Sequence, residues 1–268
     1  MMGNLRRDAA PLTERTWKKV DEAVAQAARH VLAGRRVATF DGPRGWDHAA
    51  TRLGTMKPCA TREGKATVCV EEMALLAEVR AEFALSWTTL ELFDRGAPAL
   101  DTGPAENAAR EVALAEDRIV FYGEPVGHGL LISKESPTVT TQDWAKPGQA
   151  VTDVLHAVER LDSHGIGGPY ELVLAPARYY TFLQGTEGEG GYPTSRHLRD
   201  VIAGVHRSNV IRDAGAVFST RGDDFVLTVG GDLSVGYRGH DTAGVHLFCV
   251  ETLAPQLVTP EAVCLLRP

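Results

Sequence analysis

Apolar residues recur at helical spacing in several segments of the chain. In residues 14–32 they form a stripe that repeats every three or four positions, with charged side chains around it. Thr13 is the expected N-cap of this helix and Gly34 its expected stop. The helix either packs against a core only or also forms one wall of a peptide groove. Further helices are predicted over residues 104–116, 147–163, 176–182 and 195–203.

Other segments have the short apolar runs that are typical of strands. These are predicted over residues 35–40, 118–123 and 171–175, and near the C-terminus over 216–218, 225–229, 233–237, 245–250 and 262–266. Helices and strands do not alternate strictly along the chain. The pattern therefore favours an α+β fold over a doubly wound parallel sheet.

Residues 49–68 show no sustained hydrophobic period of either kind. A loop of this length without structure of its own is uncommon inside a compact domain. Two interpretations stay open. The segment is either disordered, or it is an extended hairpin arm whose backbone groups find partners outside its own domain.

Composition is that of an average soluble globular protein, with 268 residues, 44% apolar and 24% charged side chains. The net charge of −7 is spread along the chain, which argues against nucleic acid as a partner. No secretion signal or membrane-spanning apolar run is visible, so we expect a cytoplasmic protein without a membrane partner. The four cysteines contain no C-x-x-C motif and favour neither a disulfide scaffold nor a zinc ribbon.

Motifs of the common catalytic sites are absent from the sequence, including G-x-S-x-G, H-E-x-x-H, a Walker loop and the kinase set. The nine histidines follow no metal-ligand spacing. Cys249 lies in a continuously apolar run, so we expect a core residue there and not a nucleophile. The sequence therefore predicts no catalytic residues and no metal site.

The glycine-rich segment GTEGEGGY at residues 185–192 has the wrong glycine spacing for a dinucleotide or phosphate loop, and it carries acid. One interpretation is a flexible surface turn. The other requires several copies of the chain around a symmetry axis, where Glu187 and Glu189 would form a ring that attracts cations.

Several short segments together resemble the encapsulin shell proteins, also known as the linocin-type bacteriocin family. They occur in family order from end to end: LRR at 5–7, APLTE at 10–14, GPRGW at 42–46, RG at 95–96, IGGPY at 166–170, DLSVGY at 232–237, ET at 251–252 and PEA at 260–262. The resemblance implies a phage-capsid-like (HK97-type) α+β fold with a peripheral domain, an axial domain and an extended loop. Copies of such a chain are expected to assemble into a closed icosahedral shell.

The family fold implies a division of the chain into five parts. Residues 1–48 would hold the N-terminal helix and the start of the peripheral domain, and 49–70 the extended loop, which pairs with a neighbouring subunit. Residues 71–127 would continue the peripheral domain, 128–222 would form the axial domain, and 223–268 would return to the peripheral domain. The axial domain would place a pore loop at the five-fold opening, with candidate residues Gly185, Glu187, Gly188, Glu189, Gly190 and Tyr192.

The resemblance also implies a cargo. Shells of this family enclose a dye-decolourising peroxidase or a ferritin-like iron-storage protein, which links them to oxidative stress, and a short C-terminal targeting peptide docks the cargo on the inner wall. The corresponding groove residues in this chain are Val31, Leu32, Arg35, Thr39 and Asp232. Apolar residues would bury the peptide's Leu or Ile, and Asp232 would meet its basic end. Thr39 departs from the family, in which an acid is common at this position.

Some family members bind a flavin beside a tryptophan, which makes Trp87 the candidate here. From Arg80 to Trp87 there are seven residues, one fewer than in the flavin-binding pattern, and a slip of one residue in an extended chain turns a side chain to the opposite face. We therefore expect no intrinsic cofactor. Two other functions remain as alternatives: a protease or bacteriocin-like enzyme, and a prophage major capsid protein that packages DNA.

Overall fold

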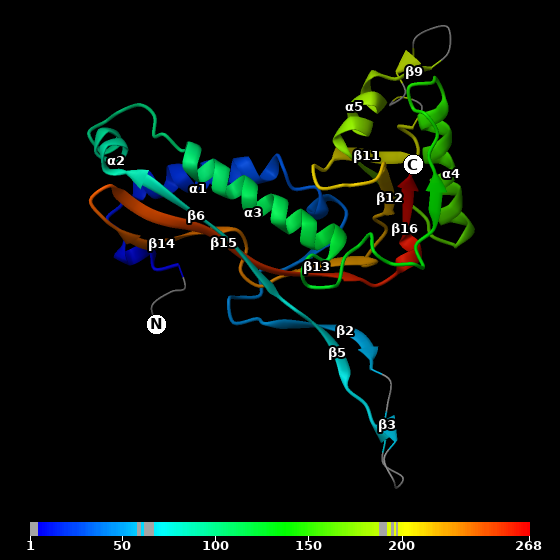
Figure 1. Cartoon of the computed structure of the whole chain (residues 1–268), viewed down its shortest axis with the longest axis horizontal. Coiled ribbons are helices and arrows are strands. Elements are labelled where there is room, and N and C mark those ends of the chain that lie inside the picture. Colours follow the sequence, from blue (N-terminus) through cyan, green and yellow to red (C-terminus); the bar gives the residue numbers. More distant parts are fainter. Residues whose placement is uncertain (1–4, 58–59, 62–66, 188–191, 194–195, 197) are drawn as a thin grey trace.

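The computed structural model describes residues 5–57, 60–61, 67–187, 192–193, 196 and 198–268. Figure 1 shows three parts: an elongated body of long helices and strands, a second sheet with its own helices at one end, and an arm that leaves the body. The N-terminus lies at the far end of the body, and the C-terminus lies in the second sheet.

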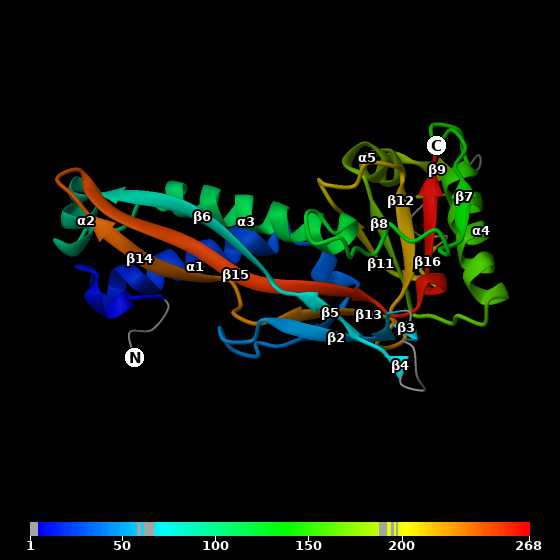
Figure 2. The ribbon, with the colours of Figure 1, turned by 60° about the horizontal axis from the view of Figure 1, so that its bottom comes forward.

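The body is a sheet with two long helices side by side on one face. Its strand order is β1-β13-β15-β14, and β6 pairs with the other edge of β15 along ten residue positions. Figures 1 and 2 show the helices α1 and α3 following the long strands. The elements are η1 (Arg7–Ala9), α1 (Glu14–Arg29), η2 (Gly34–Arg36), β1 (Thr39–Asp41), β6 (Ala77–Ser86), α2 (Trp87–Asp94), α3 (Gly103–Tyr122), β13 (Phe225–Val229), β14 (Ser234–His240) and β15 (Gly244–Leu257).

The first helix forms as the pattern predicts. The Thr13 hydroxyl accepts a hydrogen bond from the Thr16 backbone N–H at 3.3 Å, so Thr13 is the N-cap. Val20, Val24 and Ala27 on the apolar stripe are buried against α3 and the sheet. The predicted helix over 147–163 is also confirmed, as α4 (Gln149–Ser163).

Three local predictions differ from the structure in whole or in part. Residues 118–122 are the last turns of α3 and not a strand, because Ile119, Val120 and Phe121 are buried there and their packing overrides their β propensity. The helix ends at Gly123, which has φ 66°. Of the predicted strand over 35–40, residues 35–36 belong to η2 and only 39–40 are extended, as the start of β1. The predicted helix over 195–203 lies partly outside the described residues, and its last two residues, 202–203, belong to strand β11.

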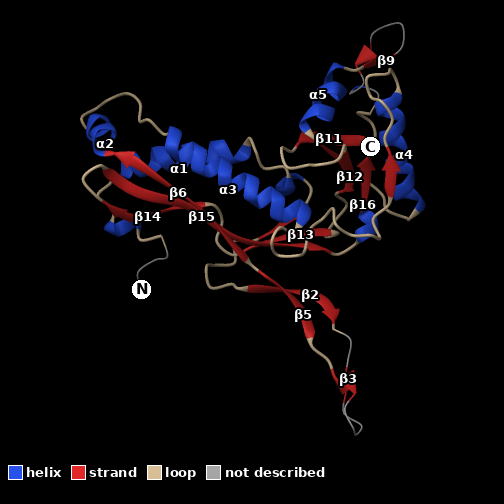
Figure 3. Ribbon diagram, in the orientation of Figure 1, coloured by secondary structure: helices blue, strands red, loops and turns tan. Residues whose placement is uncertain are grey.

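The second sheet has the strand order β11-β8-β12-β16-β7. Helix α4 packs against β16, β12 and β7, and α5 lies beside β11 (Figure 3). The last strand, β16, pairs with β12 and β7 and so belongs to this second sheet. The predicted division instead kept residues 223–268 together in the peripheral domain. The elements are β7 (Thr138–Thr140), α4, β8 (Tyr170–Leu174), α5 (Pro176–Gln184), β9 (Thr186–Glu187), β10 (Tyr192–Pro193), β11 (Ile202–Arg207), β12 (Gly215–Ser219), η3 (Pro260–Ala262) and β16 (Val263–Arg267).

In its described residues the arm is a β-hairpin, as one of the two interpretations of residues 49–68 has it, whereas pairing outside its own domain stays a prediction. Strand β2 (Ala50–Met56) pairs antiparallel with β5 (Glu71–Leu75), and further out β3 (Ala60–Thr61) pairs with β4 (Thr67–Val68). The pairing carries the arm to Leu75, past the predicted end at residue 70. Five of its large apolar side chains are 47% to 70% exposed; they are Met56, Val68, Val70, Met73 and Leu75.

Within the described part of the chain, no helix combines the length and the apolar character needed to cross a membrane. Cys249 is a free, buried cysteine, and burial raises the pKa of its thiol to about 12, as fits a core residue and not a nucleophile. Cys69 is disulfide-bonded, which the sequence did not predict.

Candidate functional site

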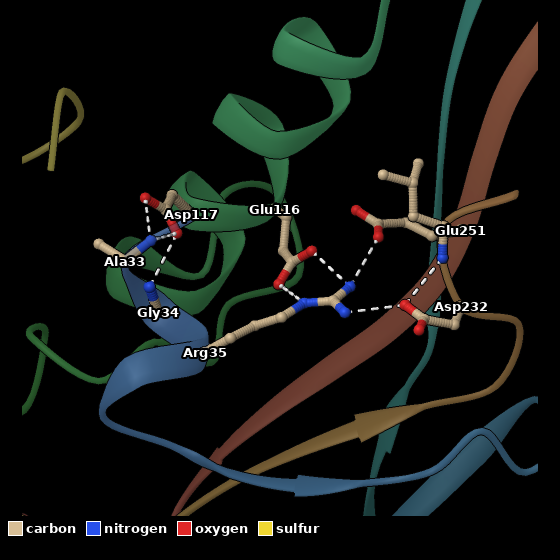
Figure 4. Close-up of polar contacts among 8 residues, drawn as sticks. Ala33, Gly34, Arg35, Glu116, Asp117, Asp232 and Glu251 are labelled. Atoms are coloured by element: carbon tan, nitrogen blue, oxygen red, sulfur yellow. Dashed lines mark hydrogen bonds and ion pairs between the residues drawn. The ribbon is translucent and has the colours of Figure 1, made fainter. Parts of the chain in front are cut away.

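A charged cluster lies where the chain leaves α1 and enters the sheet (Figure 4). Arg35 Nε and Nη2 donate to the two carboxylate oxygens of Glu116 at 2.7 and 2.8 Å. Its Nη2 also donates to Glu251 at 3.0 Å, and its Nη1 to Asp232 at 2.8 Å. One guanidinium therefore joins three carboxylates. We call these four residues the Arg35 cluster.

Each member of the Arg35 cluster comes from a different element. Arg35 stands in η2, Glu116 on α3, Glu251 on β15, and Asp232 in the turn that precedes β14. The cluster thus ties the end of the N-terminal helix to the long helix and to the sheet. Glu116 and Glu251 have side chains only 1% exposed, whereas that of Asp232 is 43% exposed. The cluster therefore opens to solvent at Asp232.

The Arg35 cluster has more negative than positive charge. Burial, followed by the charge of Glu116, raises the pKa of Glu251 well above its ordinary value, against the attraction of Arg35. Oε1 of Glu251 is buried and has no hydrogen-bond acceptor or donor among the described residues. A buried carboxylate oxygen without a partner is costly, whereas a proton on this carboxyl reduces the negative charge of the cluster. We infer that Glu251 is the member of the cluster that holds a proton.

Asp117, next to Glu116 on α3, fixes the turn after α1. Its carboxylate accepts the backbone N–H of Ala33 at 3.1 Å and of Gly34 at 2.9 Å, and the hydroxyl of Ser208 at 3.1 Å. Burial raises the pKa of Asp117 to about 7 in spite of these hydrogen bonds. A Cβ on Gly34 would lie 2.7 Å from a methyl group of Val120, so only glycine allows this approach of the turn to the helix.

The raised pKa of Glu251 makes a prediction about pH. Below the ordinary Glu pKa of about 4.3, folded and unfolded chains both bind the proton, and the buried carboxyl costs no stability. As pH rises, the unfolded chain releases the proton while the folded chain keeps it, so stability falls until the folded pKa is reached. Glu251→Gln removes this fall in stability, because glutamine has no proton to release. We expect the variant's gain in melting temperature over the wild type to grow between about pH 5 and pH 8.

Differential scanning calorimetry of the purified protein across this range checks the prediction. Glu91→Gln is the matched control, because Glu91 is exposed and pairs only with Arg95 on the same helix. A melting-temperature difference for Glu251→Gln that shrinks as pH rises would contradict a protonated Glu251.

The structure brings only part of the predicted peptide groove together. Arg35 and Asp232 are in direct contact, although Arg35 is already bound by three carboxylates. Leu32 is half-buried and lines a cavity that faces α5 and β11. Val31 is half-buried, and Thr39 is exposed on β1 with its hydroxyl 3.4 Å from the carbonyl oxygen of Gly222. The cavity that Leu32 lines is not lined by Val31, Arg35, Thr39 or Asp232.

A different cavity, of about 760 Å³, runs along the first half of α1. Leu12 and Trp17 line it, together with the ion pair between Arg7 and Asp21 at 2.7 Å. The Arg7 guanidinium stacks over the Trp17 ring at 4.0 Å. Helix α1 therefore forms one wall of this cavity, which lies at the opposite end of the helix from the predicted groove residues, and a peptide groove along α1 stays a prediction.

The pore-loop prediction lies partly outside the described residues. Gly185 follows α5 as its C-cap, and the backbones of Glu187 and Tyr192 pair across β9 and β10. Gly188, Glu189 and Gly190 lie outside the described residues. The acidic ring stays a prediction.

Trp87, the flavin candidate, is the first residue of α2. Its indole N–H donates to the backbone oxygen of Asp241 at 2.7 Å, and its ring meets the edge of His240 with the ring centres 5.8 Å apart. The polar group of the indole is thus satisfied within the chain, which is consistent with a structural aromatic residue. The described residues contain no group of His, Cys, Asp and Glu that could hold a metal.

Sequence reasoning missed Glu116, Asp117 and Glu251. A usable signal existed in α3, where residues 112, 113, 116, 117 and 120 all fall on the buried face at helical spacing. Acids at two of these core positions indicate a buried cation or backbone donors nearby. The identity of the partners could not be derived, because Arg35 and Asp232 lie far away in the sequence.

Comparison with known proteins gives full-length matches. A family model described as "Encapsulating protein for peroxidase" matches residues 2–254. A type 1 encapsulin shell protein of Rhodospirillum rubrum is 34% identical over 99% of this chain and 97% of the relative. Another, of Rhodococcus erythropolis, is 33% identical over 98% of each chain. A diheme-cytochrome-encapsulin shell fusion protein of Kuenenia stuttgartiensis is 27% identical over 96% of this chain and 74% of the relative.

Solved structures share the fold at low identity. A virus-like particle from Pyrococcus furiosus aligns with a TM-score of 0.67 and 17% identity, over 94% of this chain and 99% of that chain. The capsid of the Myoviridae phage XM1 aligns with a TM-score of 0.56 and 11% identity, over 90% and 89%. These similarities concern the fold alone, and they confirm the predicted phage-capsid-like (HK97-type) α+β fold.

Proposed function

Because the chain belongs to the encapsulin shell proteins, we propose that its copies close into an icosahedral cytoplasmic compartment around a cargo enzyme. Like its curated relatives, the chain is a shell protein and not an enzyme. In this proposal its contribution is the wall, which concentrates the cargo and limits what reaches it. Narrow pores would admit small ions, with the loop at residues 185–192 as the candidate five-fold opening.

The observation that carries the proposal is the arm. It extends from the body, and its large apolar side chains stay exposed in the isolated chain (Figure 1). Exposed apolar surface of this kind marks a site of protein association, and an unpaired strand edge invites a further strand. A neighbouring subunit is the partner that we propose for both features. Negative-stain microscopy of the purified protein tests this: closed particles of uniform size support it, and a monomer at high concentration overturns it.

We propose a peroxidase or a ferritin-like iron-storage protein as the cargo. The description of the matching family model names a peroxidase, and one relative is itself a fusion of a shell protein with a diheme cytochrome. Both point to redox chemistry inside shells of this family. A haem or iron protein that co-purifies with the particles would support this choice. Particles that contain nucleic acid by their absorbance ratio would instead support a prophage capsid.

The end of α1 is the proposed docking place of the cargo's targeting peptide, with Val31 and Leu32 as the apolar contacts and Asp232 as the acid. Leu32→Asp is expected to leave the shells intact but reduce their cargo at least about tenfold, because a charge replaces an apolar contact. Mass spectrometry of particles purified from the protein's own cells measures the cargo. Leu32→Met keeps the apolar surface and is the matched control.

A second variant tests the location. Leu12→Asp places the same charge in the cavity along the first half of α1. Normal loading in this variant, with loss in Leu32→Asp, supports docking at the end of the helix. Loss in Leu12→Asp with normal loading in Leu32→Asp would move the docking site to the other cavity.

A further inference from the structure

A cavity of about 340 Å³ lies where the end of α1 meets the second sheet. Five basic residues line it: Arg29, His30, Arg36, His206 and Arg207. Arg29 and His30 come from the last turn and C-cap of α1, Arg36 from η2, and the other two from β11. Two separate parts of the fold therefore bring cations to one place. No carboxylate lines the cavity, although the chain as a whole carries a net charge of −7.

Two carboxylates contact residues of the lining but do not line the cavity themselves. Glu171 on β8 contacts Nε2 of His206 at 2.9 Å and so orients this ring. Gly204 makes room for that pair, since a Cβ there would lie 2.3 Å from the Glu171 carboxylate. Asp117 is buried and accepts the N–H groups of Ala33 and Gly34. Neither carboxylate neutralises the arginines of the cavity.

The arginines differ in how they are held. Arg29 and Arg36 make no ion pair with a described residue. Arg207 donates to the hydroxyl of Tyr180 and lies 5.8 Å from the centre of its ring, so its guanidinium has a fixed position. Two guanidinium groups are therefore free to bind, beside a third that is already placed.

The electrostatics of the helix end explains only part of this charge. The C-terminus of α1 carries a partial negative charge, which favours Arg29 and His30 in its last turn. The partial charge of the helix end does not explain His206 and Arg207, because these two residues come from strand β11. Like charges gathered from two elements repel one another unless an anion lies between them. The arrangement is thus better explained by a ligand than by the helix alone.

We propose that this cavity binds a phosphate-class oxyanion, either free phosphate or the phosphate end of a small molecule. Guanidinium groups match the tetrahedral oxygens of phosphate through paired hydrogen bonds. A doubly charged anion is favoured over a carboxylate because three guanidinium groups line the cavity, with two imidazoles beside them. The volume falls at the lower end of the range of roughly 300–1,000 Å³ for small-molecule sites. This inference does not rest on the identity of the cargo.

Isothermal titration calorimetry of the assembled shell tests it, at constant ionic strength and neutral pH. The probes are inorganic phosphate, pyrophosphate and acetate. We expect saturable binding of one phosphate or pyrophosphate per subunit, and acetate binding at least about tenfold weaker because it carries one charge. Tighter binding of pyrophosphate than of phosphate indicates a larger phosphorylated molecule, and equal binding indicates free phosphate. Absence of saturable binding by either phosphate probe overturns the proposal.

Two variants tie the binding to this cavity. Arg36→Ala and Arg207→Ala are each expected to weaken phosphate binding at least about tenfold, since each removes a charged donor. Arg160→Ala is the matched control, because it removes an exposed arginine from the last turn of another helix, α4. If the alanine variants do not assemble, Arg36→Lys keeps the charge without the paired donors, and a weaker affinity still supports the site. Equal affinities in all variants mean that phosphate binds elsewhere and overturn the proposal.

Discussion

Arg35→Met is expected to destabilise the folded subunit by about 3–5 kcal/mol, because it leaves the buried Glu116 carboxylate without its cation. Glu116 and Glu251 are almost fully buried, and Arg35 contacts both. A loss of this size corresponds to a fall of roughly 6–20 °C in melting temperature for a chain of this length. Calorimetry of the purified shell at neutral pH, together with the yield of assembled particles, measures the effect.

Two controls separate the buried cluster from a general loss of charge. Arg44→Met breaks the solvent-exposed pair with Asp41 and is expected to leave the melting temperature close to that of the wild type. The triple variant Arg35→Met, Glu116→Gln and Glu251→Gln also removes the buried charge of Glu116 and keeps position 251 uncharged, so it is expected to recover part of the loss. An Arg35→Met shell that melts at the wild-type temperature would show that the cluster does not hold the turn to the helix and the sheet.

Periodic segments with clear start and stop signals could be predicted from the sequence. Helix α1 has its cap at Thr13 and its apolar stripe where the spacing places them, and α4 and the strands β8, β12 and β13 follow the same logic. These elements form from neighbours in the sequence, and the core only selects their buried face. The α+β class followed from their order along the chain.

Long-range packing explains what could not be predicted. Residues 118–122 have the composition of a strand but extend α3, because Ile119 and Phe121 fill a core built by strands from elsewhere in the chain. Strand β16 joins the second sheet through pairing with β12 and β7, for which no local pattern exists. In the same way, the Arg35 cluster joins residues that the sequence separates widely, and its buried acids have no local signature beyond their place on a helix face.

The double variant Met73→Asp and Leu75→Asp is expected to abolish shell assembly while leaving the subunit folded. On β5 these two side chains are exposed, whereas Ala74 between them is buried, so the strand turns its larger apolar residues away from its own body. Burying such a side chain at an interface contributes about 1.5–3 kcal/mol, and a tenfold change in association corresponds to about 1.4 kcal/mol. An aspartate in its place loses this contribution and adds an unpaired charge.

Analytical ultracentrifugation and negative-stain microscopy measure the loss of particles, and far-UV circular dichroism checks that the subunit stays folded. Met73→Leu with Leu75→Met is the matched control, because it keeps the apolar surface and should assemble normally. Wild-type particles from the aspartate variant would mean that this face of the arm contacts no neighbour. Unfolded subunits would mean that the two side chains serve the chain's own core, contrary to their exposure. Only loss of particles with retained secondary structure assigns the outward face of β5 to the contact between subunits.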